Sequence, residues 1–212
     1  MQHLVLLRAG ICRLSLVLVF ALNVFVSFTV SANEPSPKQS IQTFNATLLE
    51  AMKQADQLGY AGRYKLMEPV ILDTFAFPFM GAQSIGRYWK SLNDEQQRLF
   101  LSVYTDWSIA TYAGRFDGYS GERFEIVSES APVQGTVTVV SKLIQSNEEP
   151  IVFFYLMRNI GGQWKVVDIQ ISGVSQLALT RAQFTEVMKN KGFDGLISML
   201  KAKIAGFAQP KK

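Results

Sequence analysis

The chain contains one cysteine, Cys12, and one histidine, His3, and both lie within its first 32 residues. This placement constrains the fold, because the other 180 residues can form neither an internal disulfide nor a zinc site of His and Cys ligands. A Ser-His-Asp triad and a cysteine nucleophile are excluded from them as well. We therefore predict a domain that folds by packing alone, without metal or cofactor, and that works through shape and apolar surface rather than catalysis.

The N-terminal segment has the pattern of an export signal. Arg8 and Arg13 make its start positive, residues 14–30 form an apolar run, and the small residues Ser31 and Ala32 follow. This order is typical of a secretory signal peptide, so we expect cleavage after Ala32 and delivery to the periplasm. The alternative is an uncleaved membrane anchor, because the apolar run is long enough for a tilted span.

Residues 33–212 are then expected to form a single domain, with a length sufficient for its own core. They carry 19 Lys and Arg against 17 Asp and Glu, which is nearly neutral. Their basic residues form no stripe of the kind that binds nucleic acid, so we exclude that partner.

Two helical regions flank a region of predicted strands. Residues 40–90 are expected to be helical with breaks, and residues 93–112 form the clearest helix, capped by Asn93 or Asp94. Its inner face is predicted to carry Leu99, Phe100, Val103, Tyr104, Trp107 and Ala110. Residues 174–207 are helical again, with a break at 192–195.

Four strands are predicted between the helices, over residues 124–128, 136–144, 151–157 and 164–171. Turn residues such as Gly161-Gly162 separate them, which favours antiparallel neighbours. Residues 151–157 are apolar at every position, whereas an antiparallel strand with one wet face alternates, so both faces are expected to be covered. The fold class is therefore α+β: a curved four-stranded antiparallel sheet (NTF2/cystatin-like), with helices before and after it enclosing an apolar cavity.

Large aromatic residues gather around Pro78, in a segment that proline keeps out of a regular strand or helix interior. They form either an ordinary aromatic core or the walls of an apolar cavity. On the second interpretation, nine residues line one cavity for a lipid: Phe75, Phe77, Phe79, Tyr88, Trp89, Tyr104 and Trp107 from the helical side, with Phe154 and Val166 from the sheet.

Asp168 is the acidic residue within the last predicted strand. It could serve as a buried general base in a small exported enzyme. It could equally be a structural carboxylate, bonded to the backbone or to Arg63, Arg87 or Arg158. The structural role is favoured, because no histidine or second carboxylate is available as its partner.

Several motifs together resemble the family of MlaC-type proteins, also known as toluene-tolerance auxiliary transport proteins. The main one is residues 85–96, IGRYWKSLNDEQ, and further matches are Phe100, TYA at 111–113, WKVVD at 164–168, GVS at 173–175 and GFDGL at 192–196. They occur in the order of the family and span about residues 40–203. Residues 115–121, RFDGYSG, also resemble the HpnM-like branch, which is associated with hopanoids.

The resemblance implies a periplasmic lipid-binding shuttle with a deep apolar pocket for acyl chains. Its ligand would be a phospholipid or a hopanoid, which it would carry between an inner-membrane ABC transporter, through its MCE-domain protein, and an outer-membrane lipoprotein. The resemblance implies no catalytic residue. Two alternatives stay open: an enzyme of NTF2-like fold that uses Asp168, and an adaptor that binds protein without a ligand.

Overall fold

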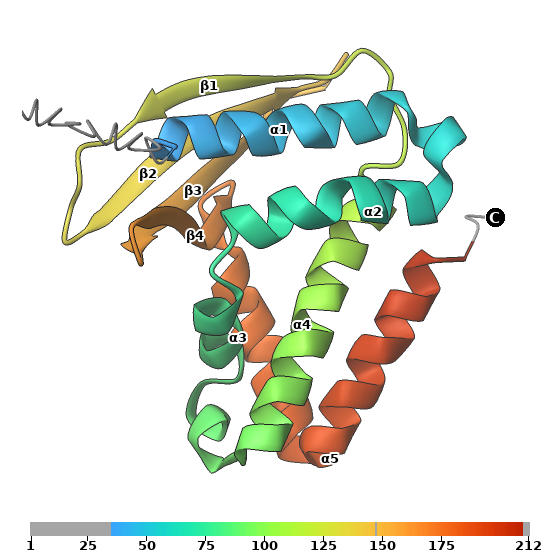
Figure 1. Cartoon of the computed structure of the whole chain (residues 1–212), viewed down its shortest axis with the longest axis vertical. Helices are drawn as coiled ribbons and strands as arrows, with labels where there is room; N and C mark the ends of the chain where they lie inside the picture. Colours follow the sequence, from blue (N-terminus) through green and yellow to red (C-terminus); the bar gives the residue numbers. More distant parts are fainter. Residues whose placement is uncertain (1–34, 147, 210–212) are drawn as a thin grey trace, which may run out of the picture. The chain divides into compact units, whose positions relative to one another are not determined.

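The computed structural model describes residues 35–146 and 148–209 (Figure 1). Its helices are α1 (Pro37–Lys53), α2 (Ala55–Thr74), α3 (Phe77–Ile85), the 3-10 helix η1 (Gly86–Ser91), α4 (Asp94–Arg115) and α5 (Gln176–Phe207). Its strands are β1 (Arg123–Glu129), β2 (Thr136–Ile144), β3 (Ile151–Ile160), β4 (Gln163–Ile171) and β5 (Val174–Ser175). The predicted export signal, residues 1–32, lies outside the described residues. Within them, no helix has both the length and the apolar character needed to span a membrane.

The described strands form an antiparallel sheet in the order β1-β2-β3-β4-β5. This confirms the α+β class, but the sheet has five strands and not the predicted four. The additional strand, β5, pairs Ser175 with Gln170 of β4 and is only two residues long, too short for a periodic pattern to reveal. The turn between β3 and β4 falls at Gly161 and Gly162, whose φ values of 64° and 94° suit a tight hairpin.

Strand β3 alternates between two environments although its sequence is apolar throughout. Tyr155 and Met157 are buried in the core, whereas Phe154 and Leu156 are half-buried on the opposite face. Successive side chains of a strand point to opposite faces. Both faces of β3 were expected to be buried, but only the face that carries Tyr155 and Met157 is fully buried.

A β-bulge in β4 changes which of its residues face the core. Leu156 pairs with Asp168 but the next residue, Met157, pairs with Val166, so Val167 is the extra residue. As a result Val166 and Ile169 both lie in the core although they are three positions apart.

Helix α1 packs along the sheet, against β1, β2 and β4 (Figure 1). Its buried side chains are Ile41, Phe44, Leu48, Ala51 and Met52, together with Pro37 and Asn45. The ring of Phe44 lies 5.3 Å from the rings of Phe75 and Tyr112 and 6.1 Å from that of Tyr155, between ring centroids. The interface between helices and sheet is therefore a packed aromatic core, because rings from both sides interdigitate there.

Helix α4 begins at the predicted cap. The side chain of Asn93 accepts a hydrogen bond from the backbone N–H of Gln96 at 2.9 Å, and the Gln96 side chain accepts one from the N–H of Asn93 at 3.1 Å. Phe100 and Tyr104 are buried as predicted. Leu99 was predicted to face inward but is 41% exposed, because it lies about 100° around the helix from Phe100, beyond the packed stripe.

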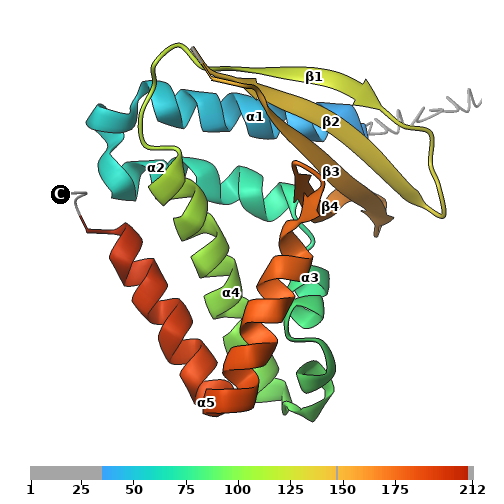
Figure 2. The same cartoon turned by 180° about the vertical axis from the view of Figure 1, so that it is seen from behind.

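Helix α5 bends at Gly192, within the predicted break, where φ is 67° and ψ is −170°. Figure 2 shows its two halves diverging from this bend. The helix packs against α3 and α4. Near its end the ring of Phe207 lies against Gly114 of α4 so closely that a β-carbon on Gly114 would collide with it.

Candidate functional site

An apolar cleft of about 410 Å³ opens between α2, the start of α3 and α4. Its lining residues are Glu68, Leu72, Phe75, Phe77, Pro78, Leu101, Ser102, Thr105, Asp106 and Ile109. Six of these side chains are apolar, and the carboxylates of Glu68 and Asp106 give the cleft a negative charge. Apolar clefts of this size, with a few polar groups, are the usual form of a small-molecule site.

The connection from α2 to α3 places Phe75 and Phe77 at the floor of the cleft. Phe75 forms an isolated parallel bridge with Val166 of β4, and the N–H of Ala76 donates to the carbonyl of Val166 at 3.0 Å. Pro78 then occupies the first turn of α3, where its missing N–H costs nothing. The aromatic segment is thus tied to the sheet on one side and to a helix start on the other.

The floor of the cleft is continuous with the aromatic core. The ring of Phe77 lies 6.2 Å from that of Tyr104, and the ring of Phe75 lies 5.8 Å from that of Tyr112. Phe75 is 5% exposed and Phe77 is 6% exposed, so both residues line the cleft while most of their surface is buried in the core. Phe44 connects this group to Tyr155 on the sheet.

Among the nine residues predicted to contact lipid, five form one connected group. Phe75 and Phe77 line the cleft, Tyr104 and Val166 are buried behind them, and Trp107 is partly buried with its ring 5.7 Å from that of Tyr104.

The other four residues are not joined to these five by a direct ring contact, although Trp89 reaches Tyr104 through Phe100, with ring centroids 6.5 Å and 5.7 Å apart in turn. Tyr88 and Trp89 are partly buried in η1 and pack against the core, and Phe79 is half-buried with the guanidinium of Arg158 5.8 Å from its ring centroid. Phe154 faces away from Tyr155, on the other side of the sheet. The nine residues therefore do not surround one cavity in this conformation, and their contact with lipid stays a prediction.

Sequence reasoning missed most of the cleft wall. Leu101, Thr105 and Ile109 are spaced four apart on α4, and Glu68 and Leu72 are spaced four apart on α2, so each set lies on one helix face. This spacing was visible in the sequence. What it did not show is that these two faces meet each other, because that depends on how α2 packs on α4.

Tyr64 lies beside the two carboxylates of the cleft wall, Asp106 and Glu68. The hydroxyl of Tyr64 donates to Oδ1 of Asp106 at 3.4 Å. Burial raises the pKa of Tyr64 well above its usual range, and the negative charges of Asp106 and Glu68 raise it further. Tyr64 is therefore a neutral hydrogen-bond donor at any physiological pH.

Asp168 holds the start of α5. Its Oδ1 accepts a hydrogen bond from the backbone N–H of Leu177 at 3.0 Å, in the first turn of that helix. Arg63, one of its predicted partners, instead donates to the carbonyls of Ala55 and Ala113, both at 3.0 Å. This geometry is that of a structural carboxylate at a positive helix end. In the described part of the chain no three acidic, His or Cys side chains form a group that could hold a metal ion.

The sequence profile of the family described as MlaC protein matches residues 42–202. The chain belongs to the MlaC family. A relative from Haemophilus influenzae, named the intermembrane phospholipid transport system binding protein MlaC, is 26% identical over 192 residues, or 87% of this chain and 89% of that protein. The toluene tolerance protein ttg2D of Pseudomonas putida is 24% identical over 108 residues, about half of each chain.

A solved structure has a similar fold to this MlaC-family chain. It is a phospholipid-binding protein from Ralstonia solanacearum in complex with a phospholipid, with a TM-score of 0.69 and 23% identity. The match covers 80% of this chain and 97% of that one. The family predicted from the sequence motifs is thus confirmed, and the hopanoid-associated branch stays a prediction.

Proposed function

We propose that this chain is a periplasmic carrier of phospholipid, whose acyl chains enter through the cleft between α2, α3 and α4. The observation that carries the proposal is the continuity of the cleft floor, through Phe75 and Phe77, with the aromatic core of a MlaC-family fold. A phospholipid is favoured over a hopanoid, because the Haemophilus relative and the Ralstonia protein are both named for phospholipid.

The energetics set what such a carrier must offer. Moving a lipid with on the order of 30 methylenes from a membrane into water costs more than about 20 kcal/mol of free energy, at about 0.8 kcal/mol for each methylene. A carrier must bury nearly as much apolar surface as the membrane does, and release fails if it buries much more.

The cleft alone is too small for two acyl chains, since about 410 Å³ is at the lower end of the range for drug-sized ligands. The chains would therefore displace the rings behind Phe75 and Phe77 and widen the interface between the helices and the sheet. Dispersion contacts with methylenes would replace part of the contacts between these rings, and each aromatic pair whose geometry is lost would cost about 0.5–1.5 kcal/mol. Tyr104 and Val166 would then line the opened pocket, as predicted from the sequence.

The polar contacts between the α2–α3 connection and the sheet lie close together, around Asp73 and Lys165. We propose that this junction stays in place while the pocket opens. Lys165 of β4 donates to the carbonyl and, at 3.1 Å, to the carboxylate of Asp73 near the end of α2, next to the bridge between Phe75 and Val166. An opening that keeps this junction and parts the rings of Phe44 and Tyr112 from Phe75 would break neither of the two ion pairs found among the described residues, Lys165–Asp73 and Arg123–Glu125.

The route of the lipid is proposed from the family resemblance. The carrier would exchange lipid with an MCE-domain protein of an inner-membrane ABC transporter and with an outer-membrane lipoprotein. Export would end with cleavage after Ala32, so that the N-terminal sequence of the periplasmic protein begins at Asn33. A product that keeps residues 1–32 and stays in the membrane would refute the cleavage.

Mass spectrometry of an organic extract of the purified protein tests the carrier function, since phospholipid is expected in it. The variant Ser102→Trp locates the binding route, because Ser102 is exposed on the wall of the cleft and the added indole would block it. Its lipid content should fall with an unchanged melting temperature. The control, Arg98→Trp, adds the same ring at an exposed position of α4 outside the cleft and should keep its lipid. An extract without lipid from the unmodified protein would refute the function.

A further inference from the structure

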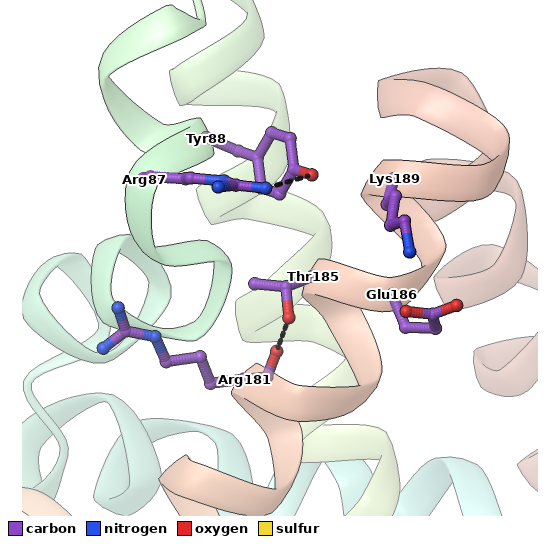
Figure 3. A pocket seen from close by; sticks show the side chains of 6 residues that line it. All are labelled: Arg87, Tyr88, Arg181, Thr185, Glu186 and Lys189. Carbon is purple, nitrogen blue, oxygen red and sulfur yellow. Dashed lines mark hydrogen bonds between the residues drawn. The ribbon is translucent and has the colours of Figure 1, made fainter.

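A second hollow, of about 360 Å³, lies between η1 and the first half of α5 (Figure 3). Its lining residues are Arg87, Tyr88, Arg181, Thr185, Glu186 and Lys189. Arg181, Thr185 and Lys189 follow each other at intervals of four, so they form one face of α5. The hollow lies at the η1 end of α3, about 13 Å along that nine-residue helix from the apolar cleft at its start.

The hollow has an excess of positive charge. Arg87, Arg181 and Lys189 contribute three cations against the single carboxylate of Glu186. No ion pair within residues 35–146 and 148–209 includes any of these four side chains. The Glu186 carboxylate instead accepts a hydrogen bond from the side-chain amide of Asn190 at 2.6 Å. The lining therefore has a net charge of +2.

Arg87 and Arg181 are exposed to solvent, and each makes one contact beside the hollow. Arg87 lies over the ring of Tyr88, with its Cζ 5.3 Å from the ring centroid. Arg181 packs against the backbone of Gly86, where a β-carbon would come within 2.8 Å of its Nη2. Gly86 also has a φ of 55°, which favours glycine at this position. The glycine thus serves both the turn into η1 and the position of Arg181.

We propose that this hollow binds a phosphate monoester or inorganic phosphate. Phosphate of this kind carries a charge of about −1.5 to −2 at neutral pH, which matches the charge of the lining. Guanidinium groups bind its oxygens through paired hydrogen bonds, and a lysine adds a third donor. Such a site is separate from the apolar cleft and does not depend on the proposed lipid carriage.

Two probes distinguish the source of the phosphate. The first is inorganic phosphate, titrated by calorimetry against chloride at equal ionic strength. The second is co-sedimentation with vesicles of phosphatidylcholine that contain phosphatidic acid, compared with vesicles of phosphatidylcholine alone. Binding of free phosphate identifies a soluble ligand, and binding to the phosphatidic acid vesicles alone identifies the head group of a lipid at a membrane surface.

Four single substitutions test the assignment to this hollow. Arg181→Gln and Lys189→Gln should each weaken binding about tenfold, because each removes a charge-assisted hydrogen bond. Lys201→Gln changes the net charge equally at an exposed position on the same helix and should have no effect. Glu186→Gln removes the opposing charge and should tighten binding about threefold or more, a gain that misfolding cannot produce.

The proposal is overturned if neither probe binds in preference to its control. It is also overturned if Lys201→Gln weakens binding as much as Lys189→Gln, since that would show a general effect of charge. Unchanged binding in Glu186→Gln and Arg181→Gln would place the ligand elsewhere on the molecule. None of these outcomes depends on whether the apolar cleft holds lipid.

Discussion

The carboxylate of Asp168 accepts a hydrogen bond from the backbone N–H of Leu177 at 3.0 Å, which joins β4 to the first turn of α5. The substitution Asp168→Asn keeps an oxygen acceptor and removes the charge that interacts with the helix dipole. We expect the free energy of unfolding to fall by about 0.3–1 kcal/mol, measured by urea denaturation. Lipid content should not change. A loss of lipid transfer at unchanged stability would contradict the structural role and favour a functional carboxylate.

Leu72 is an exposed apolar side chain on the wall of the cleft, with 47% of its surface accessible. The substitution Leu72→Ser should lower the affinity for phospholipid about threefold to tenfold, because part of a leucine side chain no longer contacts the acyl chain. Leu179→Ser is the matched control, since Leu179 is 53% exposed on α5 and does not line the cleft. Equal affinities of the two variants for a fluorescent phospholipid would show that the chains enter elsewhere.

The contact between Gly114 and Phe207 connects α4 to the end of α5. Gly114→Val would force the ring of Phe207 out of its site and should destabilise the fold by about 1–3 kcal/mol, measured by denaturant unfolding. The double variant with Phe207→Ala should be less affected than the sum of the two single changes, because the smaller residue makes room for the valine. Additive losses would mean that the two residues do not constrain each other.

We expect the folded protein to lose stability at alkaline pH, because three tyrosine hydroxyls are shielded from water. Burial raises the pKa of Tyr104, Tyr112 and Tyr155 above the ordinary value of 10.0. The folded protein then keeps these protons at a pH where the unfolded chain releases them. Their contribution to stability is therefore complete below pH 10 and is lost progressively as the pH rises above it toward the folded pKa values.

The measurement is the free energy of unfolding in urea between about pH 8 and about pH 11, where it should decline. The variant Tyr155→Phe removes one of these hydroxyls, so its stability should fall less steeply over the same range. A free energy that stays constant above pH 10 in the unmodified protein would contradict the burial of these phenols.

Much of the local structure could be predicted from the sequence, because its causes act over a few residues. Asn93 and Gln96 form the helix cap that their spacing indicated, and Gly192 bends α5 within the predicted break. Gly161 and Gly162 make the hairpin between β3 and β4. The strand β5 was missed because two residues carry no periodic signal.

The aromatic segment around Pro78 was recognised from its composition, and two of its three phenylalanines, Phe75 and Phe77, line the cleft. The third, Phe79, lies apart with Arg158, because α3 begins at Phe77 and its turn directs the residues to different sides. The sequence could not show where this helix begins, since Pro78 is compatible both with a loop and with a first helical turn.

The amino-acid sequence by itself determined the family, the helix and strand order and the absence of His and Cys chemistry after residue 32, because these depend on residue identity and short-range spacing. Only the tertiary structure decided which faces meet. A strand that is apolar throughout does not indicate which side faces the core, so Phe154 of the sheet was predicted to line the cavity although it lies on the face opposite the buried Tyr155. The bulge at Val167 shifts the pattern of β4, and the sequence did not show it either. The cleft likewise arises where faces of α2 and α4 come together, and that depends on packing between residues distant in the chain.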